Sequence, residues 1–285
     1  MDHGGVKQRY GLIGYPVKHS FSAAMHNAAF AHLGMNAQYE LFEVKPYELH
    51  DFLISLRDQG VLGVNITIPY KEKVVTFLDD ASIEVNEIGA TNTLVVDNNG
   101  KLKGFNTDSA GFAFHIAKLG VKVSHTAIIG AGGAAKAVAM ALLKNGAREI
   151  AIYDIDQKKS LELVNRVKRI NFQCNAYMVE SIQELQIKDK NFVVNTTPVG
   201  MKKEDPCLLE KNMIHPELFI YDVIYNPPVT KMLELAKNNG VQFSNGLRML
   251  LYQGMLAFEQ WTGKPAPEKV MFEALQKEVG KCQNS

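Results

Sequence analysis

The chain has 285 residues, a length that predicts about two domains. Hydrophobic residues make up 46% of the chain and charged residues 21%, which is typical of a folded globular protein and excludes a largely disordered one. The 31 basic and 30 acidic residues give a net charge of +1, so the composition shows neither the basic surface of a nucleic-acid-binding protein nor an acidic tail.

The first part of the chain has an α/β pattern. Short hydrophobic runs predict strands, and amphipathic stretches between them predict helices. The predicted strands are 9–14, 39–44, 61–68 and 94–96, and the predicted helices are 23–33, 47–59 and 72–78. The turn sequence Asp97-Asn98-Asn99-Gly100 lies between two strand patterns and predicts a hairpin.

The stretch from about 120 to 244 alternates strand and helix patterns more regularly. The predicted strands are 126–129, 150–153, 192–195 and 219–223, and the predicted helices are 133–145, 157–170 and 230–239. Alternation at this spacing predicts a parallel sheet with helices on both faces. Two more helices, 249–261 and 268–281, follow, and we expect them to return to the first domain.

A glycine-rich sequence, Gly130-Ala131-Gly132-Gly133-Ala134-Ala135, lies between a predicted strand and a predicted helix. Taken alone, such a turn is often only structural. The acidic residue that a dinucleotide site needs about 20 positions later is present, because Asp154 ends the next predicted strand. The glycines would then permit a tight turn and a close approach of the backbone to a pyrophosphate at the helix N-terminus.

Asp154 also bears on which nicotinamide cofactor binds. A carboxylate at this position accepts hydrogen bonds from the ribose hydroxyls of NAD and repels the 2′-phosphate of NADP. The next residues, Ile155 and Asp156, supply no arginine, although Lys158 and Lys159 are near enough in sequence to soften the repulsion. The sequence therefore predicts a preference for NAD and leaves NADP open.

Four polar clusters interrupt the apolar surroundings in the first part of the chain. They are Ser20-Phe21-Ser22, Asn65-Ile66-Thr67-Ile68-Pro69-Tyr70-Lys71, Gly89-Ala90-Thr91-Asn92-Thr93 and Gly104-Phe105-Asn106-Thr107-Asp108. Taken singly, Ser22, Thr107 and Asp108 are explained as helix N-caps. Lys71 is explained as a solvated surface lysine and Asn92 as a turn residue.

Taken together, and in this order, the clusters resemble the shikimate dehydrogenase family. The resemblance covers nearly the whole chain, from Gly11 to Gly263. The matching motifs are Ser20-x-Ser22 with His26-Asn27, Asn65-x-Thr67-x-Pro69-x-Lys71, Gly89-Ala90-x-Asn92-Thr93, Asn106-Thr107-Asp108-x-x-Gly111, Gly130-Ala131-Gly132-Gly133-Ala134, Asn195-Thr196-Thr197-Pro198-x-Gly200-Met201, Asp222-x-x-Tyr225-x-Pro227, Gly246-x-x-Met249-Leu250 and Gln253-Gly254.

The resemblance implies a fold, an activity and a place in metabolism. The fold would be α/β with two domains: an N-terminal α/β substrate-binding domain (1–108 plus 245–285) and a Rossmann-type nucleotide domain with a doubly wound parallel sheet (109–244). The activity would be reversible hydride transfer between NAD(P) and the pair 3-dehydroshikimate and shikimate, in chorismate and aromatic amino acid biosynthesis. Such a protein would act on a small-molecule substrate as a monomer or homodimer.

The resemblance also implies roles for individual residues. Two serines, Ser20 and Ser22, would bind the substrate carboxylate, and the pair Lys71 and Asp108 matches the family's catalytic dyad. The other positions that match substrate-binding residues are Thr67, Asn92, Tyr225 and Gln253. The positions that match cofactor-binding residues are Gly130, Ala131, Gly132, Gly133, Ala134, Asp154, Thr196, Gly246 and Met249.

The implied dyad suits the chemistry, since hydride removal from a secondary alcohol needs a group that moves the hydroxyl proton in step. Burial would lower the pKa of Lys71, whereas the neighbouring Asp108 would raise it, and the sequence leaves that balance open. Hydroxyl groups such as those of Ser20 and Ser22 suit a carboxylate because they donate hydrogen bonds without adding a charge to be desolvated.

Three alternatives remain. Many biosynthetic family members have an Asn-Arg-Thr pattern after the second nucleotide-domain strand and use NADP. The run Asp154-Ile155-Asp156 instead resembles members that use NAD and often oxidise quinate, so a quinate/shikimate dehydrogenase of broader specificity is the close alternative. A methylene-tetrahydrofolate dehydrogenase would need a Tyr-x-x-x-Lys stretch, which Tyr70-Lys71 does not supply, and a nucleotide-sensing module would not need the dyad.

Targeting and metal signals are weak. The segment 1–8 has no apolar core, no stretch is apolar enough to span a membrane, and the cysteines, Cys174, Cys207 and Cys282, are too few and too far apart for a disulfide framework. We therefore expect a cytoplasmic protein. His26 and His32 are six residues apart and do not share a helix face, so we expect no metal site.

Overall fold

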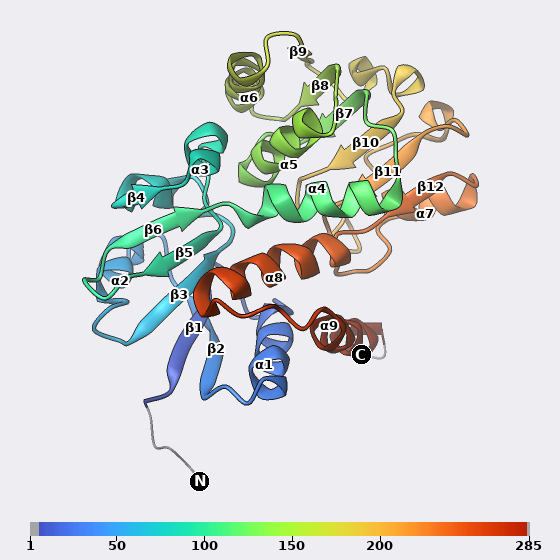
Figure 1. Cartoon of the computed structure of the whole chain (residues 1–285). Coiled ribbons are helices and arrows are strands. Elements are labelled where there is room, and N and C mark those ends of the chain that lie inside the picture. The colour runs from blue at the N-terminus through green and yellow to red at the C-terminus, as the bar shows by residue number, and fades with distance from the viewer. Residues whose placement is uncertain (1–5, 284–285) are drawn as a thin grey trace. The chain divides into compact units, whose positions relative to one another are not determined.

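The computed structural model describes residues 6–283 and divides into two compact units (Figure 1). The first unit comprises the chain up to Thr107 and from Leu251 onward, and the second unit runs from Asp108 to Leu250. Each unit has its own six-stranded sheet and its own hydrophobic core. The predicted α/β fold is confirmed.

The sheet of the first unit is mixed. Its strands are β1 (Gln8–Gly14), β2 (Ala37–Glu43), β3 (Val61–Ile66), β4 (Asp80–Ala81), β5 (Thr93–Val96) and β6 (Leu102–Phe105), arranged in the order β2-β1-β3-β5-β6-β4. The first three strands are mutually parallel, whereas β5 is antiparallel to both β3 and β6. The hairpin predicted around 97–100 is confirmed, because β5 and β6 pair on either side of this turn.

The helices of the first unit differ in part from those predicted. They are α1 (Ser22–His32), α2 (Leu49–Ser55), a 3-10 helix (Lys73–Phe77), α3 (Ile83–Ile88), most of α8 (Leu247–Thr262) and α9 (Glu268–Gln283), which packs against α1 (Figure 1). The helix predicted over 47–59 is shorter, because the chain turns after Ser55 and reaches Gly60 at a φ of +68°. The stretch 72–78 contains β-branched and aromatic residues, which favour helices poorly, and forms a 3-10 helix.

One layer of the first unit is an aromatic group packed between strands and helices. Its members are Tyr10, His26, Phe30, Tyr39, Phe258 and Trp261. The rings of His26 and Tyr39 are parallel within 7° and 4.4 Å apart between centroids. The Trp261 indole N–H donates a hydrogen bond to the carbonyl of Leu94 at 2.9 Å, which ties α8 to the sheet. This group therefore fixes β2 and α1 relative to α8.

The sheet of the second unit is entirely parallel. Its strands are β7 (His125–Ile129), β8 (Glu149–Tyr153), β9 (Asn175–Met178), β10 (Phe192–Asn195), β11 (Phe219–Asp222) and β12 (Gln242–Ser244), in the order β12-β11-β10-β7-β8-β9. The chain adds strands on one side of β7 and then on the other, so the strand order reverses between β7 and β10. This is the doubly wound topology that places ligands outside the carboxyl ends of the strands at the reversal.

Helices cover both faces of this sheet. They are α4 (Thr107–Leu119), α5 (Gly133–Lys144), α6 (Gln157–Ile170) and α7 (Lys231–Asn238). Successive residues of a strand point to opposite faces, so Ile128 packs in the core beneath α4, α5 and α6 while Ile129 packs in the core beneath α7. Residues buried on both faces explain the continuous hydrophobic runs that made these strands predictable.

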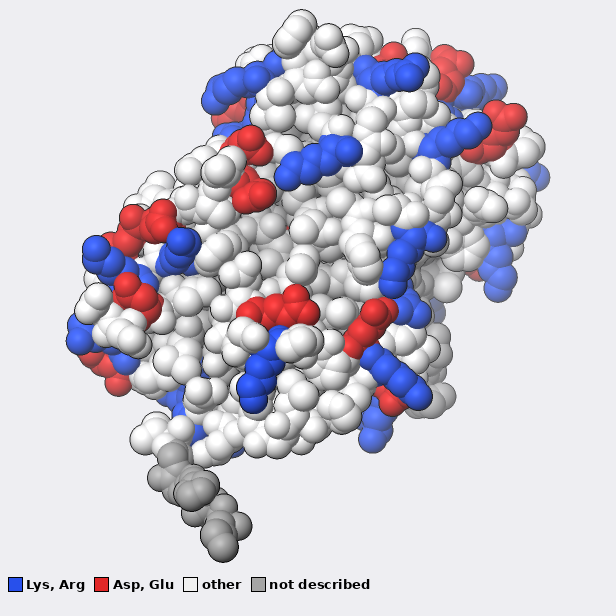
Figure 2. Space-filling model, viewed as in Figure 1, with Lys and Arg blue, Asp and Glu red and all other residues white. Residues whose placement is uncertain are grey.

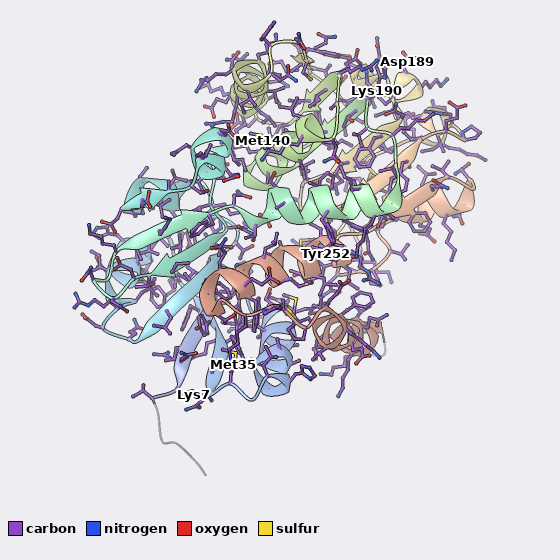
Figure 3. All side chains as sticks on the ribbon, in the orientation of Figure 1. Lys7, Met35, Met140, Asp189, Lys190 and Tyr252 are labelled. Carbon is purple, nitrogen blue, oxygen red and sulfur yellow. The ribbon has the colours of Figure 1, made fainter. Side chains whose placement is uncertain are left out.

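The charged residues are mostly at the surface, with four buried exceptions among the described Asp, Glu, Lys and Arg residues: Asp108, Lys136, Lys190 and Asp222. Lys and Arg side chains are interspersed with Asp and Glu side chains over the face shown in Figure 2. One of the buried exceptions is Lys190, labelled in Figure 3. Its ammonium group contacts the carboxylate of Glu149 at 2.5 Å and the hydroxyl of Tyr177 at 3.0 Å. The two cysteines whose side chains are described, Cys174 and Cys207, are free thiols. In the described part of the chain, no helix is long and apolar enough to cross a membrane.

Candidate active site

The glycine-rich loop joins β7 to α5. Gly130 adopts a φ of +105°, and its N–H donates to the carbonyl of Tyr153 at 2.7 Å. A Cβ atom at Gly130 would lie 2.5 Å from Thr196 Oγ1, so this position needs glycine on two grounds. Gly132 is the N-cap of α5, and a Cβ atom there would meet no protein atom within 4 Å. The space beside Gly132 is therefore open, and a ligand can approach the first backbone N–H groups of α5, those of Gly133 and Ala134.

The predicted ribose-binding carboxylate lies directly beside this loop. Asp154 follows β8, and its Oδ2 atom accepts a hydrogen bond from the Ala131 N–H at 2.7 Å. Its Oδ1 atom accepts one from the Asp156 N–H at 2.8 Å, and Asp156 caps α6. Ile155, between the two acids, is 90% exposed. The carboxylate is thus anchored to the loop while its neighbour is open to solvent.

Thr196 borders the loop because of the sheet register. Ile129 and Asn195 are paired across β7 and β10, so the residues that follow them, Gly130 and Thr196, lie side by side where the strand order reverses. Both the N–H and the hydroxyl of Thr196 donate to the carbonyl of Ile129 at 2.8 Å. The structure therefore brings Gly130, Ala131, Thr196 and Asp154 together.

A buried carboxylate lies at the next strand end. Asp222 accepts hydrogen bonds from the Thr230 hydroxyl at 2.7 Å, the Ile224 N–H at 3.0 Å and the Asn195 side-chain amide at 3.1 Å. Burial raises the pKa of Asp222 to about 6, against the opposing effect of these three donors. Asp222 belongs to one of the matching family motifs, but no separate role for it is predicted from the sequence. Its contacts connect the carboxyl ends of β10 and β11.

The segment that begins α8 is held against the loop after β11. The Gly246 N–H donates to the carbonyl of Ile224 at 3.1 Å, and a Cβ atom at Gly246 would lie 1.9 Å from the carbonyl oxygen of Val223. Only glycine fits at this position. Tyr225, which follows this contact, is half-buried, and Met249 is buried in the core beneath α4, α5 and α6. The second unit therefore extends beyond 244, to Leu250.

The two predicted carboxylate-binding serines lie together at the start of α1. The hydroxyls of Ser20 and Ser22 are 3.2 Å apart, and the Ser22 N–H donates to Ser20 Oγ at 3.3 Å. Ser22 is buried, whereas Ser20 is half-buried. Thr67 follows β3 and is held by a hydrogen bond from its N–H to the carbonyl of Ile13 at 2.9 Å.

Asn92 and Gln253 are brought into direct contact, although 161 positions separate them in sequence. The Asn92 amide nitrogen donates to Gln253 Oε1 at 3.2 Å and to Thr107 Oγ1 at 2.9 Å. The Thr107 N–H in turn donates to Asn92 Oδ1 at 2.7 Å. These side chains are buried, and Tyr252, labelled on α8 in Figure 3, precedes Gln253.

The two residues of the predicted dyad belong to different units. Lys71 lies in the loop after β3, is half-buried, and accepts a hydrogen bond on its backbone carbonyl from the Thr91 N–H at 2.8 Å. Asp108 is the second residue of α4 and is buried. A carboxylate in the first turn of a helix is favoured by the helix dipole. Among the described residues, no cluster of three His, Cys, Asp or Glu side chains has the geometry of a metal site.

Comparison with known proteins identifies the family. The family model for the shikimate dehydrogenase substrate binding domain matches residues 12–94, and that for the shikimate 5′-dehydrogenase C-terminal domain matches residues 246–276. A shikimate dehydrogenase (NADP(+)) from Desulforamulus reducens is 41% identical over 285 residues, which cover 97% of each chain. The chain belongs to the shikimate dehydrogenase family.

Solved structures of shikimate dehydrogenase relatives have the same fold. The shikimate 5-dehydrogenase of Listeria monocytogenes, solved in complex with shikimate and NAD, is 35% identical with a TM-score of 0.84, covering 95% of this chain and 97% of that one. The quinate dehydrogenase of Corynebacterium glutamicum, in complex with NAD, is 28% identical with a TM-score of 0.87, covering 95% and 99%. The family resemblance expected from the ordered motifs is confirmed, and this shikimate dehydrogenase family member has a nicotinamide-dependent oxidoreductase fold.

Proposed function

We propose that this protein is a shikimate dehydrogenase, catalysing reversible hydride transfer between a nicotinamide cofactor and the pair 3-dehydroshikimate and shikimate. The observation that carries the proposal is the 41% identity over 97% of both chains to a relative of that name. The geometry supports it, because the first unit contains two pairs of polar side chains suited to a hydroxylated acid, Ser20 with Ser22 and Asn92 with Gln253. The second unit contains a glycine-rich loop suited to a dinucleotide.

Most of the residues proposed to bind the substrate belong to the first unit. Ser20 and Ser22 present neighbouring hydroxyls that suit one carboxylate, and their closeness at 3.2 Å supports a shared ligand. Asn92 and Gln253 suit the ring hydroxyls, since each side-chain amide can donate and accept. Thr67 and Tyr225 complete the proposed set of substrate-binding residues.

Lys71 and Asp108 are the proposed catalytic dyad. When bound, the nicotinamide supplies or accepts the hydride, and the protein must handle the proton. In the oxidation, Lys71 takes the hydroxyl proton as the C–H hydride leaves, and in the reduction it returns a proton to the forming alcohol. Asp108 would hold the lysine in place and balance its charge.

The second unit is the proposed cofactor domain, and we propose that it prefers NAD. The pyrophosphate would lie over Gly132, Gly133 and Ala134 at the N-terminus of α5. Asp154 would meet the adenosine ribose with a negative charge that is already anchored to the loop. Relatives differ in cofactor, since the Desulforamulus reducens enzyme is named for NADP and the Listeria monocytogenes enzyme was solved with NAD. The side chains here favour NAD because Ile155 offers a 2′-phosphate no positive charge.

Steady-state kinetics of the full chain with shikimate and quinate, each against NAD and NADP, tests substrate and cofactor together. We expect the highest kcat/KM for shikimate with NAD. Turnover of neither acid would contradict the proposed function, and a higher kcat/KM with NADP would contradict the reading of Asp154. A higher kcat/KM for quinate would favour the second candidate, a quinate dehydrogenase, which the likeness to the Corynebacterium glutamicum enzyme supports.

Replacement of Lys71 tests the proton-transfer role. The Lys71→Ala change should lower kcat for shikimate oxidation by about 10²–10⁴-fold while KM for NAD changes little, because general acid–base groups contribute about that much. A matched control is Lys73→Ala, which removes an exposed lysine on the 3-10 helix two residues away. A Lys71→Ala enzyme within tenfold of the unmodified one would remove Lys71 from the mechanism.

A further inference from the structure

A directional chain of buried hydrogen bonds runs from Tyr39 to Asn92. The Tyr39 hydroxyl donates to Asn65 Oδ1 at 2.8 Å. The Asn65 amide nitrogen donates to Thr93 Oγ1 at 3.0 Å and to the backbone carbonyl of Asn92 at 3.2 Å. The Thr93 hydroxyl then donates to Asn92 Oδ1 at 3.1 Å. Strand register explains the geometry, since Asn65 and Thr93 face each other across β3 and β5.

Two backbone groups fix the direction of this chain. A backbone N–H only donates, so the Thr107 N–H at 2.7 Å requires that Asn92 present its oxygen there. A backbone carbonyl only accepts, so the Asn92 carbonyl requires that Asn65 present its nitrogen. Asn65 Oδ1 is then directed away from both and needs a donor, which Tyr39 supplies. The backbone groups of Asn92 and Thr107 thus fix the direction of every hydrogen bond in the chain, and the Tyr39 hydroxyl supplies the donor that this direction requires at Asn65.

The consequence falls on the part of Asn92 that faces Gln253. Because Asn92 Oδ1 already accepts from Thr93 and Thr107, its amide nitrogen is turned to the opposite side. One of its hydrogens is held by Thr107 Oγ1, and the other lies on Gln253 Oε1 at 3.2 Å. A ligand can therefore bind the Asn92 side chain through an oxygen that replaces Gln253 Oε1 as the acceptor of this hydrogen, whereas Asn92 Oδ1 is already occupied by its own donors.

Tyr39 is itself held in place through both its ring and its backbone. The His26 ring stacks on its ring at 4.4 Å. Asn27 binds its backbone with both ends of its amide, accepting from the Tyr39 N–H at 2.8 Å and donating to the Tyr39 carbonyl at 3.0 Å. The residues of this hydrogen-bonded chain are at most 7% exposed, so water cannot readily replace a lost hydrogen-bond partner. A change at Tyr39 must then be accommodated by the amides.

We propose that Tyr39 is a positioning residue of the substrate site: through Asn65 and Thr93, its hydroxyl sets the Asn92 amide so that this side chain binds substrate as a hydrogen-bond donor. This rests on the proposed function, in which Asn92 is a substrate ligand. Without the hydroxyl, Asn65 Oδ1 is buried and unpaired, and the Asn65 amide must shift away from Thr93 to satisfy it. Asn92 Oδ1 then loses the hydrogen bond from Thr93 and keeps only those from Thr107.

The Tyr39→Phe change tests the proposal because it removes one oxygen and keeps the ring that stacks on His26. We expect KM for shikimate to rise about three- to tenfold, the range for one lost hydrogen bond, while KM for NAD is unchanged. The matched control is Tyr10→Phe, which removes a buried phenol oxygen from the same aromatic group outside the hydrogen-bonded chain. An equal rise in the control, or no rise with Tyr39→Phe, would overturn the proposal.

A double-mutant cycle separates positioning from a general effect on the fold. In an Asn92→Ala background, Tyr39→Phe should change kcat/KM for shikimate less than about twofold, since the side chain through which Tyr39 acts is gone. An effect as large as that in the parent protein would show that Tyr39 acts by another route and would overturn the proposal.

A readout in the ligand-free protein keeps this inference distinct from the proposed function. NMR of protein labelled with ¹⁵N-asparagine follows the side-chain amide of Asn92 directly. We expect Tyr39→Phe to shift these amide resonances and to speed their hydrogen exchange at least threefold, and Tyr10→Phe to leave them unchanged. Unchanged Asn92 resonances in Tyr39→Phe would overturn the positioning role even if shikimate is turned over. A parent protein that does not oxidise shikimate would instead contradict the proposed function.

Discussion

The charge on one side chain, Asp154, sets the proposed cofactor preference. Its carboxylate keeps a fixed position because the Ala131 and Asp156 amides both donate to it. An asparagine could keep the bond from Ala131 through its oxygen, so Asp154→Asn removes the charge while retaining the anchor. The neighbouring Ile155 is exposed, so an arginine there could reach a 2′-phosphate without disturbing the core.

The double change Asp154→Asn with Ile155→Arg should therefore raise the ratio of kcat/KM for NADP over NAD by at least about tenfold, because it replaces a repulsive charge with an attractive one. Kinetics with saturating shikimate measure this ratio. Asp156→Asn is the control, since that carboxylate caps α6, and it should move the ratio far less. An unchanged ratio in the double variant would mean that the preference is set elsewhere.

His26 is a second residue whose surroundings shift a measurable property, here the pH dependence of the free energy of unfolding. It is fully buried, neither ring nitrogen has a hydrogen-bond partner among the described residues, and burial lowers its pKa to about 3. The unfolded chain, with an ordinary histidine pKa near 6.5, then binds a proton before the folded one does. The free energy of unfolding must therefore fall as pH decreases from about 6.5 towards 3.

Replacing this ring tests the effect. Between pH 7 and pH 5 the titration of His26 should cost about 2 kcal/mol of stability, and His26→Phe, which keeps an aromatic ring against Tyr39, should remove that loss. Urea unfolding at the two pH values measures it, with His26→Leu as a second variant in case the larger ring does not fit. His32→Asn, at an exposed position on the same helix, should leave the pH dependence as it is. Parallel pH curves for His26→Phe and the parent would rule out the assignment.

The loop between β7 and α5 contains glycines with two different roles: Gly130 is required by the fold, whereas Gly132 leaves space for a ligand. Gly130→Ala should destabilise the protein by about 2 kcal/mol, because the residue has a φ of +105° and its new Cβ would meet Thr196 Oγ1. Gly132→Ala should leave stability nearly unchanged, since the space beside it is open. It should still raise KM for NAD about tenfold or more by blocking the approach of the pyrophosphate to the amides.

Thermal unfolding and cofactor kinetics of the two variants distinguish these effects. A Gly132→Ala protein with normal KM for NAD would place the pyrophosphate elsewhere. KM for shikimate serves as the internal control, because the residues proposed to bind its carboxylate, Ser20 and Ser22, lie in the other unit.

The helices and strands show which parts of the fold could be predicted from the sequence. The inner strands of the second unit were predictable because each is a hydrophobic run buried on both faces. The two edge strands, β9 and β12, were missed because they are short and carry polar residues such as Asn175 and Gln242. Helix α3 was also missed, although Ser82 at its N-cap and Gly89 at its C-cap are ordinary signals for a helix.

The candidate site likewise has a part that the sequence predicted and a part that it did not. Ordered motifs pointed to Asn92 and Gln253, and the structure places them in contact. The chain that orients Asn92 could not be predicted, because it depends on the register of β3 with β5 and on a tyrosine in a different strand. Tyr39 in the sequence is an ordinary strand residue, and only the tertiary structure connects its hydroxyl to Asn65.

In the second unit, Asp222 has the opposite effect to His26 on the pH dependence of the free energy of unfolding. Asp222 is fully buried and its folded pKa, about 6, is above the value of 3.8 expected of the carboxyl in the unfolded chain. The folded state therefore holds this proton more tightly, and the free energy of unfolding falls as pH rises from about 4 to about 6, by about 2 kcal/mol. His115, whose pKa burial lowers to about 4, acts in the other direction, so a variant is needed to isolate Asp222.

Asp222→Asn should remove this loss. The difference in unfolding free energy between variant and parent should move by about 2 kcal/mol in favour of the variant between pH 4.5 and pH 7. Urea unfolding followed by circular dichroism measures that difference. Thr230→Val is a useful comparison, because it removes one donor to the carboxylate and should strengthen the pH dependence. A difference that does not vary with pH would show that Asp222 titrates normally.

Trp261 is the only tryptophan of the chain, and its ring lies wholly within the first unit. It stacks on Tyr10, and Gly63 faces it where a Cβ atom would lie 2.3 Å from the indole. Selectively excited tryptophan fluorescence is therefore an optical label for one half of the molecule, whereas circular dichroism reports both halves. If the units unfold separately, the two signals will trace different denaturation curves. Shikimate alone would then displace the fluorescence curve, and NAD alone would displace the part of the dichroism curve that fluorescence does not detect.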